Sequence, residues 1–221
     1  MNKKALFVFS FTLLFALVGI AFAHQPRIAG ESAQDKVIEI TNPEVSQAFY
    51  GTIKDWPAIY KINLSEAKNI YIGILSPNIT GADKDFSVDV VGGGKHYFLD
   101  GSNYTWGNFH EEFANDDYFK GPEGTFQLAK GETILTVFSP DNTGKYVLVV
   151  GSKESFPPKE ILKAFVSLPQ MKVGFFGKSI FTIFFNKIGF YLFGSVAILA
   201  VLVIGIKIVL KKKGQQTNLS V

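Results

Sequence analysis

Short runs in which apolar and polar residues alternate fill the middle of the chain, from residue 37 to residue 151. Ile62 and Leu64 alternate with Lys61 and Asn63, the pattern of a strand that buries one face. Clusters of Gly, Pro, Asn and Asp separate the runs, as turns require. The pattern predicts nine strands: Val37–Thr41, Ala48–Ile53, Ile59–Leu64, Asn69–Leu75, Phe86–Val91, Tyr97–Leu99, Thr125–Leu128, Thr133–Phe138 and Tyr146–Val150.

Many short strands without intervening helices are typical of an antiparallel β-sandwich or jelly roll. We therefore expect an all-β ectodomain over residues 24–158. Within it, residues 133–150 form the clearest predicted hairpin, because the turn sequence Pro140-Asp141-Asn142-Thr143-Gly144 joins two strand patterns.

The stretch from Gly92 to Pro122 does not follow a simple strand pattern. Its aromatic residues at positions 106, 109, 110 and 113 have the spacing i, i+3, i+4 and i+7, which places them on one face of a helix. This spacing predicts a short helix beginning near Thr105. Long connections often carry function, although this one could instead close the open end of a sandwich. If exposed, four of its aromatic side chains are candidates for binding a protein or glycan partner: Tyr97, Tyr104, Trp106 and Phe109.

Both ends of the chain are apolar and flanked by Lys. Residues 188–206 contain no charge over 19 positions, and Lys211-Lys212-Lys213 follow, which predicts a transmembrane helix at 188–210. Residues 1–23 carry Lys3-Lys4, an apolar run and Ala21-Phe22-Ala23, the features of a signal peptide. An uncleaved N-terminal anchor is the alternative. Either way, residues 24–187 are expected outside the cytoplasm and the tail 211–221 inside.

A basic and aromatic stretch connects the predicted ectodomain to the predicted anchor. Residues 159–187 combine Phe side chains with Lys172, Lys178 and Lys187 and hold no acidic residue after Glu160. We expect a short helix or linker at Lys159–Leu168, followed at Lys172–Lys187 by an amphipathic helix lying on the outer surface of the bilayer. A contact with a membrane partner and a longer, tilted anchor are the alternatives.

The net charge of +3 hides a separation of charge along the chain. All 19 Asp and Glu lie between Glu31 and Glu160, and residues 24–168 hold 13 of the 22 Lys and Arg. The excess of positive charge therefore flanks the apolar ends, which argues for membrane topology and against nucleic-acid binding. The chain has no Cys, which excludes disulfides and thiolate ligands.

Catalytic motifs are incomplete in this sequence. His110-Glu111-Glu112 begins like the zinc-protease motif, but Ala114 occupies the position of the second His. Gly94-Lys95 resembles the end of a phosphate-binding loop without its hydroxyl residue, and no G-x-S-x-G motif occurs. We therefore expect no enzymatic activity.

Cleavage after Ala23 would make His24 the first residue of the mature protein. A free N-terminal His offers its amine and its imidazole Nδ1 to one copper ion, and imidazole suits copper. A signal peptide, a mature His and a β-sandwich together resemble the exported copper-binding and copper-brace proteins. The resemblance implies copper as a cofactor, with His24 as a ligand and further ligands drawn from His96, His110, Glu111 and Glu112.

Two functions follow as hypotheses from the sequence. The first is a single-pass, membrane-anchored, extracytoplasmic module, non-enzymatic, that binds a protein or glycan at the cell surface or envelope. The second is a copper-binding protein that uses His24.

Overall fold

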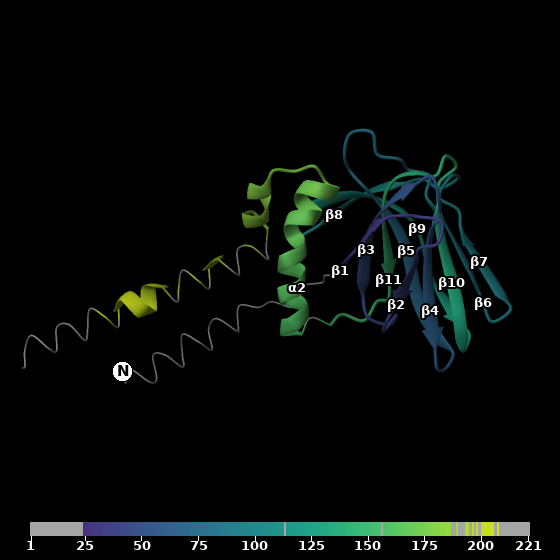
Figure 1. Cartoon of the computed structure of the whole chain (residues 1–221), viewed down its shortest axis with the longest axis horizontal. Helices are drawn as coiled ribbons and strands as arrows, with labels where there is room; N and C mark the ends of the chain where they lie inside the picture. Colours follow the sequence, from purple (N-terminus) through teal and green to yellow (C-terminus); the bar gives the residue numbers. More distant parts are fainter. Residues whose placement is uncertain are drawn as a thin grey trace, which may run out of the picture.

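The described part of the chain forms a two-sheet β-sandwich with helical turns on one side (Figure 1). The structure is a computed structural model, and it describes residues 24–112, 114–155, 157–186, 189, 193, 194, 196, 198, 200–205 and 207. No helix within these ranges is both long and apolar enough to cross a membrane. The predicted signal peptide 1–23, the tail 211–221 and much of the predicted anchor 188–210 lie outside the described residues.

Each sheet has a continuous ladder of hydrogen bonds. Sheet A contains, in spatial order, β1 (Gln25–Glu31), β3 (Gln47–Lys54), β11 (Thr143–Val150), β5 (Lys68–Pro77), β9 (Asp116–Leu128) and β8 (Gly107–Glu111). Sheet B contains β2 (Val37–Ile40), β4 (Ala58–Leu64), β10 (Gly131–Phe138), β6 (Ser87–Gly92) and β7 (Lys95–Leu99). Each of the nine predicted strands corresponds to an observed strand. Eight have ends that differ by a few residues, whereas the predicted Thr125–Leu128 is only the last part of β9.

The sheets are mixed, which corrects the prediction of a purely antiparallel sandwich. β1 pairs with β3 in parallel, and β2 pairs with β4 in parallel. The cause is the path of the chain, because β1, β2, β3 and β4 alternate between sheet A and sheet B. Two successive crossings restore the original direction, so strands two apart in sequence run side by side in the same sense.

The predicted hairpin over residues 133–150 is wrong, although both of its strands exist. β10 pairs with β4 and β6 in sheet B, whereas β11 pairs with β3 and β5 in sheet A. The turn between them therefore crosses from one sheet to the other. Ser139 Oγ donates to the Thr143 carbonyl, and Thr143 Oγ1 donates to Asp141, which fixes this corner. Turn sequences look alike in hairpins and in such corners, so local pattern does not distinguish them.

The short helix predicted near Thr105 is also wrong, because β8 occupies that position. Phe109 lies opposite Tyr118 in the antiparallel pair of β8 and β9, and strand pairing overrides the local helical spacing. β9 was only partly predicted, since Gly121-Pro122 resembles a turn. The register between β5 and β9 shifts at this point, and such bulges are where Pro is tolerated within a sheet. β1, with Pro and Arg on a sheet edge, was missed.

Aliphatic and aromatic side chains from both sheets fill the space between them. Along β11, Tyr146, Leu148 and Val150 point into this core, and all three are buried. The Tyr146 and Tyr60 hydroxyls form a 2.7 Å hydrogen bond between the sheets, which satisfies two polar groups inside the core. A Cβ added to Gly51 would lie 2.4 Å from the Tyr146 hydroxyl, so glycine makes room for this ring.

Three helical pieces follow the last strand: α2 (Pro158–Pro169), the π-helical turn η1 (Gln170–Phe175) and the 3-10 turn η2 (Ile180–Phe184). The first agrees with the short helix or linker expected at Lys159–Leu168, and the other two replace the single amphipathic helix expected at Lys172–Lys187. Gly177, with a φ of 65°, separates the last two pieces in a conformation that side-chain-bearing residues rarely adopt. The division turns Phe175 and Phe176 toward the sandwich, where both are buried.

We predict that Gly51→Ala destabilises the fold by about 1–3 kcal/mol, because the added methyl group overpacks the site of the Tyr146 ring. Urea unfolding of a fragment covering residues 24–186 measures the change. Gly107→Ala is the matched control, since nothing lies within 4 Å of its added Cβ. Equal stability of the two variants would contradict the packing described for Tyr146.

Candidate functional site

The outer face of sheet A is covered by residues 157–186, which we call the docked segment. A second hydrophobic cluster joins Val147 and Val149 of β11 and Tyr118 of β9 to Met171, Phe175 and Phe176 of the segment. The Tyr50 and Phe175 rings meet edge to face with centroids 5.2 Å apart, and Tyr118 and Phe176 do so at 5.4 Å. Sheet A is therefore buried on both faces, and the docked segment is part of the folded unit.

A buried ion pair lies at the centre of this contact. Lys172 Nζ is 2.6 Å from Asp116 Oδ2 and also donates to the Ala114 carbonyl at 2.5 Å. The exposed fractions of the two charged side chains are 1% and 0%. Lys178 binds the other oxygen of the same carboxylate at 2.8 Å. Burial lowers the pKa of Lys172, and the hydrogen bond and charge of Asp116 oppose that shift.

Further polar contacts hold the rest of the docked segment. At its start, Glu160 pairs with Arg27 of β1 at 2.8 Å and with Lys163 at 2.7 Å. Burial raises the pKa of Glu160, but the hydrogen bonds and charges of the two cations outweigh it and lower the pKa overall. In its middle, Lys145 of β11 donates to the carbonyl oxygens of Gly174 and Phe175, at 3.2 and 2.6 Å. The segment is thus tied to the sandwich along its length.

The outer face of sheet B carries no such cover among the described residues, and it points away from α2 (Figure 1). The strand registers place Val37, Ile59, Thr136, Asp89 and Phe98 in one row across the five strands. The adjacent row contains Glu39, Lys61, Ile134, Val91 and His96.

Large apolar side chains on this face remain in contact with solvent. Val37, Val91 and Phe98 are each about half exposed. Phe98 stacks on Phe138 with ring centroids 6.2 Å apart. Exposed apolar side chains grouped on one face are typical of interaction surfaces.

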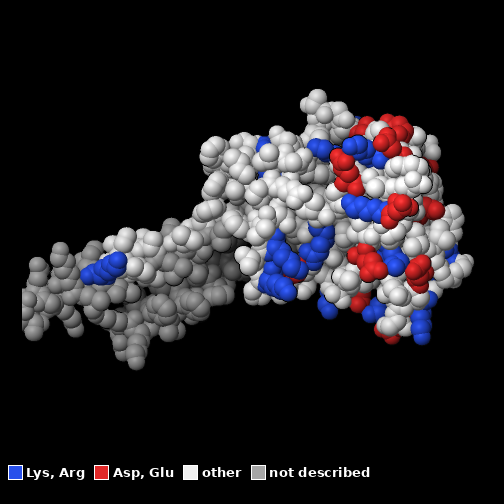
Figure 2. All heavy atoms as spheres, viewed as in Figure 1, with Lys and Arg blue, Asp and Glu red and all other residues white. Residues whose placement is uncertain are grey.

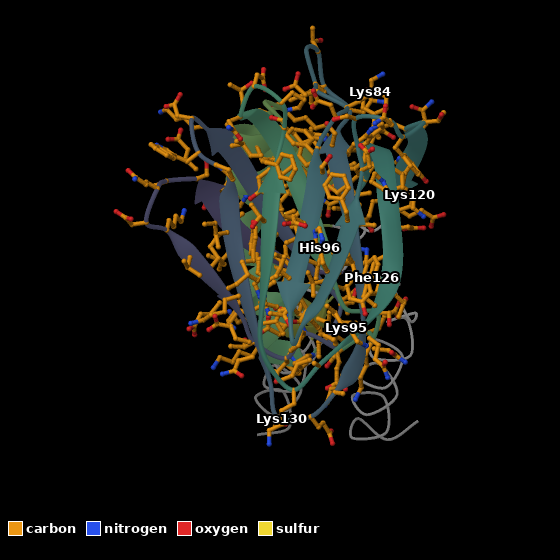
Figure 3. All side chains as sticks on the ribbon, turned by 90° about the vertical axis from the view of Figure 1, so that its right-hand side faces the viewer. Lys84, Lys95, His96, Lys120, Phe126 and Lys130 are labelled. Atoms are coloured by element: carbon orange, nitrogen blue, oxygen red, sulfur yellow. The ribbon has the colours of Figure 1, made fainter. Side chains whose placement is uncertain are left out.

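The structure places the three histidines apart. His24 precedes β1 and contacts the Ser46 hydroxyl through Nδ1, while His110 lies on β8 with Nδ1 2.7 Å from Asp117. β1 and β8 are the opposite edges of sheet A, about 24 Å apart at roughly 4.8 Å per strand. His96 lies on β7 of sheet B, facing the viewer in Figure 3, and contacts Asp89.

The two acidic residues predicted as copper ligands lie near His110. The Glu111 carboxylate accepts a hydrogen bond from the Ala114 amide at 2.7 Å, and Glu112 is exposed close by. Within the described part of the chain, no three His, Cys, Asp or Glu side chains are grouped as a metal site requires. The predicted ligands are not brought to His24, and copper binding by His24 stays a prediction.

The four aromatic candidates have different surroundings. Trp106 donates to the Gly101 carbonyl at 2.8 Å and packs on the core, where Gly121 leaves room for its ring. Tyr97 packs on Phe126, which is labelled in Figure 3, with ring centroids 4.8 Å apart. Phe109 packs against the cluster under the docked segment. Of the four, Tyr104 has the most exposed side chain, at 45%.

Sequence reasoning missed both Asp116 and the outer face of sheet B. Asp116 was visible only as part of an acidic pair, and nothing local indicated that it is buried against lysines 56 and 62 residues away. The face of sheet B had a usable signal, because Val91, Ile134 and Val37 sit at outward positions of predicted strands where polar residues are usual.

No family model matches the sequence, and no curated protein matches it. Among solved structures, the pre-peptidase C-terminal domain of a collagenase from Bacillus anthracis matches 55% of this chain and 99% of its own, with 16% identity and a TM-score of 0.34. A ruminal GH26 endo-β-1,4-mannanase matches 48% of this chain and 20% of its own, with 15% identity and a TM-score of 0.27.

CorA, a surface-associated copper-binding protein important in copper acquisition by Methylomicrobium album BG8, is also similar. The match covers 57% of this chain and 83% of CorA, with 13% identity and a TM-score of 0.19. Scores this low carry no argument about function, for CorA or for the two enzymes.

We predict that Asp116→Asn destabilises the fold by about 3–5 kcal/mol, because it leaves the Lys172 cation buried without its counter-charge. Urea unfolding of residues 24–186 gives the magnitude, and trypsin cleavage after Lys172 reports whether the docked segment has been released. Glu31→Gln is the matched control. It breaks an ion pair whose side chains are more than 60% exposed and should change stability by less than about 1 kcal/mol. Similar losses from the two substitutions would contradict the central role of the buried pair.

A second prediction concerns pH and His24. Burial lowers the pKa of its imidazole below 6.5, so the unfolded chain gains this proton at a higher pH than the folded chain. The free energy of unfolding should therefore fall as the pH drops below about 6.5, while above it both states are neutral. His24→Gln removes this contribution. Unfolding of both proteins at about pH 8 and pH 5 should show the variant gaining relative stability in acid. If the difference in unfolding free energy between the two proteins is the same at both pH values, the predicted contribution of His24 is refuted.

Proposed function

We propose that this protein is a membrane-anchored, non-enzymatic module that presents the outer face of sheet B to a protein partner outside the cytoplasm. The observation that carries the proposal is the contrast between the two outer faces of the sandwich. The docked segment covers sheet A, whereas sheet B exposes Val37, Val91 and Phe98. Soluble domains usually bury such side chains or use them for binding.

The direction of the chain supports this assignment. The docked segment leads into the uncharged run that begins at residue 188. The described residues 200–205, yellow in Figure 1, lie beyond α2 on the side away from the sandwich. An anchor on that side turns the outer face of sheet B away from the bilayer, where a partner can reach it.

The chemistry of the face favours a protein over a glycan. Glycan binding commonly relies on exposed aromatic rings as stacking platforms, and a single Phe, Tyr or Trp ring in the two rows described for this face, the half-exposed Phe98, could serve as one. Val91 and Ile134 lie in the adjacent row of the same face, and Lys61 of β4, between Glu39 at 3.1 Å and Glu132 at 3.9 Å, adds charge to it. Apolar side chains interspersed with charged ones occur in many protein interfaces.

Site-specific photo-crosslinking in cells that produce the full chain tests the proposal. A photo-reactive residue at Val91 and another at Phe98 should both capture one and the same protein, because the two positions lie on adjacent strands of the same face. The same residue at Glu154, exposed and outside sheet B, is the matched control. The substitution Val37→Glu, on the same face, should reduce the product at least tenfold. Crosslinks that are equal at Glu154, or that extend to glycans, would refute a protein site on this face.

A further inference from the structure

A second exposed apolar surface lies on the docked segment, on the side opposite the sandwich. Ala164 and Leu168 of α2, a helix that packs against β1, are buried, whereas Leu162 and Val166 are 64% and 71% exposed. At 100° per residue, positions two away from Ala164 point to the opposite side of the helix. We call the exposed apolar side chains of the segment the apolar rim: Ile161, Leu162, Val166, Val173, Ile180, Phe181, Phe184 and Phe185.

The exposure of this rim is high for a folded protein. Phe181 and Phe185 are 67% and 74% exposed, more than any large apolar side chain of the sheet B face. The rim comes from three consecutive elements, α2, η1 and η2, that the buried ion pair of Lys172 holds on one side of the sandwich. It is therefore a continuous feature of the segment and not a set of scattered residues.

The charges around the rim are positive. Glu160 is the segment's one acidic residue, and it is turned onto Arg27 and Lys163 with an exposed fraction of 13%. Lys159 and Lys163 reach the surface of α2, and Figure 2 shows Lys and Arg gathered there. A cationic border beside exposed Leu, Val and Phe matches the interfacial region of a bilayer with anionic head groups.

The rim is continuous with the predicted anchor. Phe193, a described residue of the uncharged run, packs on Phe184 with centroids 4.5 Å apart and lies 6.4 Å from the Phe165 ring of α2. The Gly189 amide donates to Asn186 Oδ1 at 2.8 Å. Two described residues of the apolar run, Gly189 and Phe193, therefore contact the docked segment.

We propose that the apolar rim is a bilayer-contact surface, inserted at the level of the head groups and upper acyl chains of the outer leaflet. This inference rests on the proposed membrane anchor and adds to it the side chains that touch lipid. Lys159 and Lys163 contact anionic head groups beside the inserted rim. The bilayer then covers the far side of the docked segment, and the sandwich stands in one orientation with sheet B facing outward.

Single-site spin labelling of the full chain in vesicles of phosphatidylcholine and phosphatidylglycerol tests the proposal. The chain has no Cys, so one introduced Cys gives one label. Labels at Val166 and Phe181 report on the rim, and a label at Val91, exposed on sheet B, is the matched control. The rim labels should collide more often with lipid-soluble oxygen than with a water-soluble nickel chelate. The order should reverse at Val91.

Different results would refute the membrane anchor and the bilayer-contact surface. Release of the full chain from the vesicles by alkaline carbonate would refute the anchor, and with it the inference. A chain that resists carbonate while its rim labels collide with nickel as often as Val91 would overturn the bilayer-contact surface and leave the anchor intact. Rim labels shielded from both reagents, with spectra broadened by a second nearby label, would identify another copy of the chain as the occupant and would also overturn it.

Discussion

The buried contact between Asp116 and Lys172 constrains the rest of this structure. Two charges removed from water are tolerated only when they pair closely, and here one carboxylate binds two lysines of the docked segment. The contact therefore couples β9 to a segment 56 residues further along the chain. Without Asp116, the Lys172 cation would be buried between the docked segment and sheet A with no counter-charge.

This coupling gives the sandwich two unlike outer faces. Alternation along β11 sends Tyr146, Leu148 and Val150 into the core and Val147 and Val149 toward the docked segment. Sheet A is thus the central layer of three, and sheet B is an outer layer with one face in solvent. That asymmetry, more than any single side chain, is the reason to propose that sheet B presents the binding face.

The histidines illustrate how tertiary structure limits candidate chemistry. His96 and His110 each contact an Asp on a neighbouring strand, on different sheets, and His24 is partly buried beside Ser46. Nearness in sequence suggested that His96 and His110 belong to one loop. In the structure, β7 and β8 place them on separate sheets.

The sequence by itself predicted nine of the eleven strands in the described part of the chain, since alternation with period two depends only on which side chains must be buried, and it pointed to the apolar ends of the chain. It missed the edge strands β1 and β8. It did not determine which strands pair. β10 and β11 look like a hairpin but cross between sheets, because pairing depends on backbone partners distant in sequence. Nor did it reveal that residues 157–186 cover sheet A. From the sequence alone, Lys172 resembled a surface lysine. In the structure it is buried against Asp116, because the burial of a charge depends on which residues the tertiary structure places around it.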